Sequence, residues 1–123
     1  MLRNNLYTLQ LLEAATDGSL IRSEIKLNSR HPVFEGHFPG NPILPGVCTV
    51  QIIRELLELS IRKSLKLIRA GSIKYLGFVN PEMMPILEFR FQLKYDEDGN
   101  ISCSVVVSTQ EKAICSFKGT FHS

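Results

Sequence analysis

Residues 47–67 carry apolar side chains around most of a helical circumference. One apolar stripe follows helical spacing and a second set widens it, the two sets being Val47, Val50, Ile53, Leu57 and Ile61, and Ile52, Leu56 and Leu59. The polar strip that remains is narrow, because its members fall within about 60° of one another on a helical wheel; they are Gln51, Glu55, Glu58 and Arg62. A helix this apolar must be covered on most sides, so the rest of the chain has to wrap around it.

Several other segments alternate between apolar and polar residues, as half-buried strands do. The alternation is clearest at residues 87–95, and turn signals at 96–99 and 110–112 separate it from two further alternating runs. The remaining expected strands are residues 20–27, 73–79, 101–107 and 113–121, whereas residues 6–13 fit either a strand or a helix. Successive hairpins predict a mostly antiparallel sheet, so we expect one α+β domain over residues 1–123, with about six strands and one long helix.

Composition and charge narrow the classes of protein that fit. The net charge of +2 is too small to indicate nucleic-acid binding, and no apolar run approaches the roughly 18 residues of a spanning helix. The N-terminal stretch lacks the continuous apolar core of a secretory signal. Three cysteines, odd in number and widely spaced, predict reduced thiols in the cytoplasm, and their spacing indicates no metal site. No cofactor requirement is visible.

A loop at residues 31–46 holds four of the six prolines and three of the eight glycines, so no regular helix or central strand is expected there. His37 lies in this loop, and histidine can take or give a proton near neutrality. The expected helix start offers the free N–H groups of Gly46, Val47 and Cys48, which could polarise a carbonyl. A base beside such groups suits removal of a proton α to a carbonyl. The alternative is a packed loop with a surface histidine.

The run from Phe34 to Val47 reads F-x-G-H-F-P-x-x-P-x-x-P-G-V and resembles the signature of the 3-hydroxyacyl-acyl-carrier-protein dehydratases. The similarity continues into residues 78–89 and 113–121. It implies a hotdog fold, in which a curved antiparallel sheet wraps a central helix. It also implies a homodimer with active sites at the subunit interface, the alternatives being a higher oligomer or a heterodimer with a paralogue.

The resemblance implies a reaction and roles for individual residues. The substrate would be a 3-hydroxyacyl chain on the phosphopantetheine of an acyl carrier protein or coenzyme A, dehydrated to the 2-enoyl thioester in fatty acid or polyketide-type synthesis. His37 would abstract the α-proton and Gly46 would donate its N–H to the thioester carbonyl. Val47, Phe38 and Pro39 are the other residues expected to contact the substrate.

The sequence departs from the family pattern on the central helix. The family has an acidic residue at the position of Gln51, and commonly a glutamine at the position of Glu55. An amide cannot donate a proton as a carboxylic acid does. Either Gln51 orients the leaving water, or Glu55 supplies the acid from one turn further on, or the chain is a non-catalytic subunit or acyl-binding partner of an active dehydratase. Acyl thioesterase activity is a further alternative.

A stretch rich in bases follows the central helix, because residues 62–74 contain five lysines and arginines and no acid. Arg62, Lys63 and Lys66 could form a docking patch for an acidic acyl carrier protein, since opposite charges speed encounter. The alternative interpretation is a solvated helix end.

Overall fold

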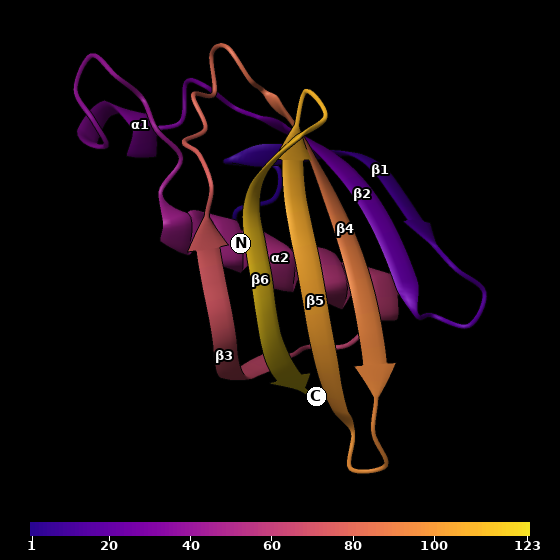
Figure 1. Ribbon diagram of the computed structural model, residues 1–123. Coiled ribbons are helices and arrows are strands. Elements are labelled where there is room, and N and C mark those ends of the chain that lie inside the picture. Colours follow the sequence, from indigo (N-terminus) through magenta and orange to yellow (C-terminus); the bar gives the residue numbers. More distant parts are fainter.

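The computed structural model describes residues 1–123 and contains one antiparallel sheet and one long helix. The strands are β1 (Tyr7–Ala14), β2 (Leu20–Leu27), β3 (Lys66–Tyr75), β4 (Ile86–Tyr95), β5 (Asn100–Thr109) and β6 (Lys112–His122). The helices are α1 (Val33–Gly36) and α2 (Gly46–Ile61). The strand order is β1-β2-β4-β5-β6-β3, and Figure 1 shows α2 crossing one face of this sheet. The predicted α+β class and the hotdog arrangement of sheet and helix are confirmed.

The core lies between α2 and the sheet face that curves around it. Alternate residues of β4, β5 and β6 point to this face, as the period of two predicts, and they are almost fully buried. From the helix, Ile52, Ile53, Leu56 and Leu57 complete the same cluster. This packing fixes the direction of α2 and therefore the place where the helix begins.

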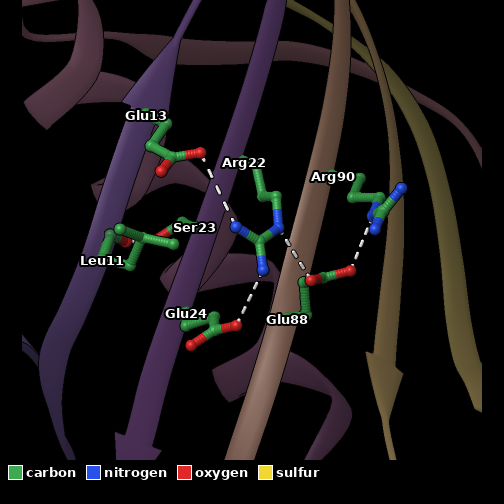
Figure 2. Close-up of polar contacts among 7 residues, drawn as sticks. All are labelled: Leu11, Glu13, Arg22, Ser23, Glu24, Glu88 and Arg90. Carbon is green, nitrogen blue, oxygen red and sulfur yellow. Dashed lines mark hydrogen bonds and ion pairs between the residues drawn. The ribbon is translucent and has the colours of Figure 1, made fainter. Parts of the chain in front are cut away.

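The opposite face of the sheet carries charged side chains. Arg22 on β2 contacts Glu24 at 2.9 Å, Glu88 of β4 at 2.9 Å and Glu13 of β1 at 3.6 Å, and Glu88 also pairs with Arg90 at 2.6 Å (Figure 2). These pairs face solvent, where water and salt screen them, so they contribute little to stability. They mark this face as the solvated one.

Two boundaries and the structure of one loop differ from those expected. The long helix ends at Ile61 instead of continuing to residue 67, because Arg62 adopts a left-handed conformation with φ of 60° and its N–H bonds to the Glu58 carbonyl. Lys66 and Arg69 therefore lie on β3, which begins seven residues before the expected strand at 73–79. The loop at 31–46 contains one helical turn, α1, which Pro32 can precede because the first turn needs no N–H. Residues 6–13 resolve as β1.

Candidate active site

The proline-rich loop after α1 is closed by its own backbone hydrogen bonds. Ile43 donates to the carbonyl of His37 at 2.8 Å, and Phe38 and Asn41 exchange two bonds at 3.1 and 2.9 Å. Leu44 is buried and donates its N–H to the carbonyl of Val79 at 2.9 Å, which ties the loop to the segment that follows β3. The loop is thus held at both its tip and its end, and His37 has a fixed backbone.

The half-buried ring of His37 is oriented by a second contact with the same loop. Its Nδ1 lies 3.1 Å from the carbonyl oxygen of Ile43. A carbonyl can only accept a hydrogen bond, so Nδ1 carries the proton and Nε2 keeps a free lone pair. The ring also stacks on Phe38, with 4.3 Å between the ring centroids. His37 is therefore presented in the tautomer that can accept a proton at Nε2.

The start of α2 leaves two backbone donors without an acceptor. Pro45 precedes the helix in an extended conformation and supplies no side-chain cap. The N–H groups of Gly46 and Val47 form no hydrogen bond within the chain, as expected for a first helical turn. The N–H of Cys48, also expected to be free, bonds to the Pro45 carbonyl at 3.0 Å. The set of free donors is therefore smaller by one than the sequence predicts.

His37 and Gly46 line one mostly apolar cavity of about 290 Å³. Its other lining residues are Phe38, Ile43, Leu44, Thr49, Tyr75, Gly77, Phe78, Val79, Ile114 and Cys115. The cavity thus brings together three of the site residues predicted from the sequence, namely His37, Phe38 and Gly46. Val47 and Pro39 do not line it, and Val47, at the start of the helix, is 77% exposed.

Gln51 and Glu55 lie outside this cavity within the single chain. Glu55 is fully buried, and its carboxylate accepts hydrogen bonds from the backbone N–H of Leu2 at 2.9 Å and Arg3 at 3.0 Å, and from the Tyr7 hydroxyl at 3.0 Å. The amide of Gln51 donates a fourth at 2.8 Å. Glu55 therefore anchors the segment that leads into β1.

The hydrogen bonds also determine the charge of Glu55. Burial alone raises the pKa of the Glu55 carboxyl, but the bonds from Leu2, Gln51, Arg3 and Tyr7 together outweigh it, and the net effect lowers the pKa. The group is held as a carboxylate, the form that accepts protons and cannot donate one. This geometry gives no support to Glu55 as the acid, an assignment that stays a prediction.

Tyr75 and Thr49 line the cavity and were not among the residues predicted from the sequence. Tyr75 ends β3 and Thr49 lies in the first turn of α2. The sequence could have indicated Tyr75, because it is the only tyrosine in the alternating run of residues 73–79. Only the pairing of β3 with β6, which sets Tyr75 opposite Cys115, places that run against the helix start.

The three bases of the expected docking patch are all exposed at the far end of α2. Arg62 ends the helix, Lys63 follows it and Lys66 begins β3. A helix rises about 1.5 Å per residue, so this corner lies about 24 Å along the axis from Gly46. Docking at this corner stays a prediction.

Two further observations concern metals and membranes. No three His, Cys, Asp or Glu side chains cluster as metal ligands would. Neither helix combines the length and the apolar character that a membrane crossing requires.

Comparison with known proteins connects this geometry to a family. Residues 13–118 match the family model of the ApeI-like dehydratases. The chain is 33% identical to the 3-hydroxyacyl-acyl-carrier-protein dehydratase FabZ of Lactiplantibacillus plantarum, in an alignment that covers 72% of this chain and 63% of the relative. It is 29% identical to the FabZ of Zymomonas mobilis, covering 87% and 63%. The chain thus spans less than two thirds of the length of these relatives.

Solved structures show the same fold at lower identity. The dehydratase heterocomplex ApeI:P from Xenorhabdus doucetiae matches with a TM-score of 0.74 at 15% identity, over 94% of this chain and 97% of that one. A mutant thioesterase from Pseudomonas aeruginosa matches with a TM-score of 0.65 at 13% identity, over 92% and 78%. The fold is therefore shared by proteins with different reactions, and it does not by itself choose between them.

Proposed function

Because this chain belongs to the ApeI-like dehydratase family, we propose that it removes water from a 3-hydroxyacyl thioester and gives the 2-enoyl thioester. One observation carries the proposal: His37, with Nε2 free, and Gly46, with its N–H free, line the same apolar cavity. A proton acceptor and a carbonyl anchor are the two groups that proton abstraction α to a thioester requires.

The two groups divide the first half of the reaction between them. The thioester oxygen accepts a hydrogen bond from the Gly46 N–H, and negative charge that develops on this oxygen is stabilised there. Nε2 of His37 takes a proton from C2, and the electron pair of that C–H bond forms the C2–C3 double bond. The C3–O bond then breaks and the hydroxyl group leaves with its electrons. The apolar lining of the cavity favours these steps because it excludes water.

The substrate is proposed to arrive as a phosphopantetheine thioester in the cytoplasm, carried by an acyl carrier protein or coenzyme A. The relatives from Lactiplantibacillus plantarum and Zymomonas mobilis are named for carrier-protein substrates, which favours the carrier protein. The aliphatic and aromatic walls suit an acyl chain. The chemistry needs no further cofactor, since it moves only protons and a hydroxyl group.

The reaction class can be tested with purified protein and 3-hydroxyacyl-pantetheine thioesters of several chain lengths. We expect enoyl thioester to accumulate, measured by absorbance and mass spectrometry, with no release of free thiol. Release of free thiol without enoyl product would contradict dehydration and would identify a thioesterase, a reaction that a solved neighbour of the same fold carries in its name. Binding of the thioester without turnover would also contradict dehydration, and it would indicate an acyl-binding subunit.

The exposed side of β3 supports assembly with a second subunit. Leu67, Ile73 and Tyr75 pair with Phe121, Phe117 and Cys115, three residues that point into the core. Cross-strand partners share one face of a sheet, so these side chains face the α2 side, yet Leu67, Ile73 and Tyr75 are 37%, 38% and 53% exposed. An edge strand with exposed apolar side chains on one face is suited to pairing with another sheet. We propose a homodimer formed through β3, with a paralogue as the alternative partner.

A charge on this strand is expected to prevent self-association. Ile73→Lys should sediment as a monomer at micromolar concentration whereas the wild type sediments as a dimer, because the lysine would be buried between two apolar strands. Val106→Lys is the matched control, since Val106 is similarly exposed, at 41% against 38%, but lies on β5 away from the edge. A monomeric wild type would contradict the homodimer and favour the paralogue.

A further inference from the structure

The cavity holds a proton acceptor and a carbonyl anchor but no carboxylic acid. The amide of Gln51 is engaged with Glu55, and the carboxylate of Glu55 is engaged with the N-terminal segment. A hydroxyl group that leaves C3 needs a proton to depart as water, since hydroxide is a poor leaving group. Within the chain, a donor other than these two must face the substrate.

Tyr75 lies where such a donor is needed. It ends β3, and its phenol lies against the first residue of α2: a Cβ built on Gly46 would collide with the Tyr75 hydroxyl and lie 2.7 Å from Cζ of the ring. The Tyr7 and Tyr95 hydroxyls donate to Glu55 and to the Gly18 carbonyl, whereas the Tyr75 hydroxyl has no hydrogen-bond partner within the chain. Tyr75 lines the same cavity as His37 and is 53% exposed, so no group of the chain takes its proton.

We propose that the Tyr75 hydroxyl donates the proton that converts the departing 3-hydroxyl group into water, an assignment that rests on the proposed dehydration. As the C3–O bond breaks, its electron pair stays on oxygen and takes the phenolic proton, leaving a Tyr75 phenolate. The α-proton now on His37 then returns the phenolate to the phenol, directly or through a water molecule. The net products are the enoyl thioester and water, and both side chains are restored.

The protonation state of the phenol fits this role. Burial raises the pKa of Tyr75, so the hydroxyl stays protonated at neutral pH. Transfer to the leaving group is nevertheless downhill, because hydroxide is the conjugate base of water, whose pKa is about 15.7. A phenol is thus a weak but fully available acid for this step.

Gly46 brings the carbonyl anchor and the proposed proton donor, Tyr75, close together. The absence of a Cβ at the helix start lets the Tyr75 ring approach the backbone that anchors the carbonyl. In a 3-hydroxyacyl thioester the carbonyl oxygen and the C3 hydroxyl are separated by only two carbon–carbon bonds. A donor beside the carbonyl anchor is therefore also within reach of the leaving group.

Tyr75→Phe removes the hydroxyl oxygen and keeps the ring. General acid catalysis typically contributes about 10²–10⁴-fold, and for a weak acid we expect kcat for the 3-hydroxyacyl thioester to fall about 100-fold with little change in KM. Tyr95→Phe is the matched control, since it removes the hydroxyl of a similarly exposed tyrosine that bonds to the Gly18 carbonyl outside the cavity. The control should keep the wild-type kcat.

A substrate with a better leaving group separates acid catalysis from a structural role. Fluoride is a weak base and departs without a proton, so a 3-fluoroacyl thioester should be turned over equally fast by the wild type and Tyr75→Phe. Equal slowing on both substrates, or an unchanged kcat on the hydroxy substrate, would overturn the assignment of Tyr75. Neither result affects the proposed dehydration as long as the wild type forms enoyl product. If the wild type forms no enoyl product, dehydration itself is refuted.

Discussion

Glu55→Ala is expected to lower the free energy of unfolding by about 3–5 kcal/mol, since each buried donor left without an acceptor costs about 1–3 kcal/mol. The substitution deprives the N–H groups of Leu2 and Arg3 and the Tyr7 hydroxyl of their acceptor and leaves a cavity beneath them. A loss of this size is a large part of the roughly 5–15 kcal/mol that stabilises a typical domain. Urea unfolding followed by circular dichroism measures it.

The control for this prediction is Glu97→Ala, which removes an exposed carboxylate from the β4–β5 turn and should change stability very little. Glu55→Gln gives a second measurement if the alanine variant does not fold. It keeps the volume but loses the charge that four donors surround, and it should also be destabilised. A urea midpoint that is unchanged in both Glu55 variants would show that the N-terminal segment does not need this carboxylate to stay packed.

The same group makes stability depend on pH in a defined direction. The folded-state pKa of Glu55 is lowered, so its contribution is fully present above the unfolded-state value and is lost as pH falls through the folded-state value. The wild type should therefore lose stability in acid. Glu55→Gln should lose less over the same pH range, because its side chain does not titrate.

His37→Ala is expected to lower kcat for enoyl formation by about 10²–10⁴-fold, the usual contribution of a general base. The ring is half-buried and packs mainly on Phe38, so the fold should survive and the loss should appear in turnover. Initial rates on a 3-hydroxyacyl thioester, with a thermal melt of the same preparation, measure both effects.

His31→Ala is the matched control for this substitution. His31 precedes α1 in the same segment, is also half-buried, and uses its Nδ1 to accept a hydrogen bond from Val33 at 3.0 Å. It lies outside the cavity, so its removal should leave kcat near that of the wild type. Equal activity of His37→Ala and the wild type would remove the base from the mechanism and with it the proposed reaction.

Local patterns were sufficient to predict the elements whose side chains alternate or repeat regularly. The strand at 87–95 and the two hairpin partners after it follow from period-two alternation, and they lie within a few residues of β4, β5 and β6. The prediction that His37 lies near Gly46 followed from the proline-rich loop between them, because a loop this short cannot carry the two residues far apart. Such features depend on residues close together in the chain.

The features that the sequence did not reveal depend on contacts between distant segments. Glu55 binds the backbone of residues more than fifty positions earlier, and nothing in the helical pattern distinguishes it from a solvated glutamate. The start of β3 at Lys66 is set by its pairing with His122 at the other end of the chain. Tyr75 became a candidate only once this pairing placed the end of β3 over Gly46.

For the proposed acyl substrate, the hydrogen bond from Leu44 to Val79 limits how the cavity can be altered. It joins two adjacent backbone segments that both line the cavity, and no side-chain substitution removes it because both of its groups belong to the backbone. A longer or branched chain would have to be accommodated by trimming side chains such as Phe78 or Ile114. Selection for altered chain length should therefore return mutations at those positions, with the loop backbone kept as it is.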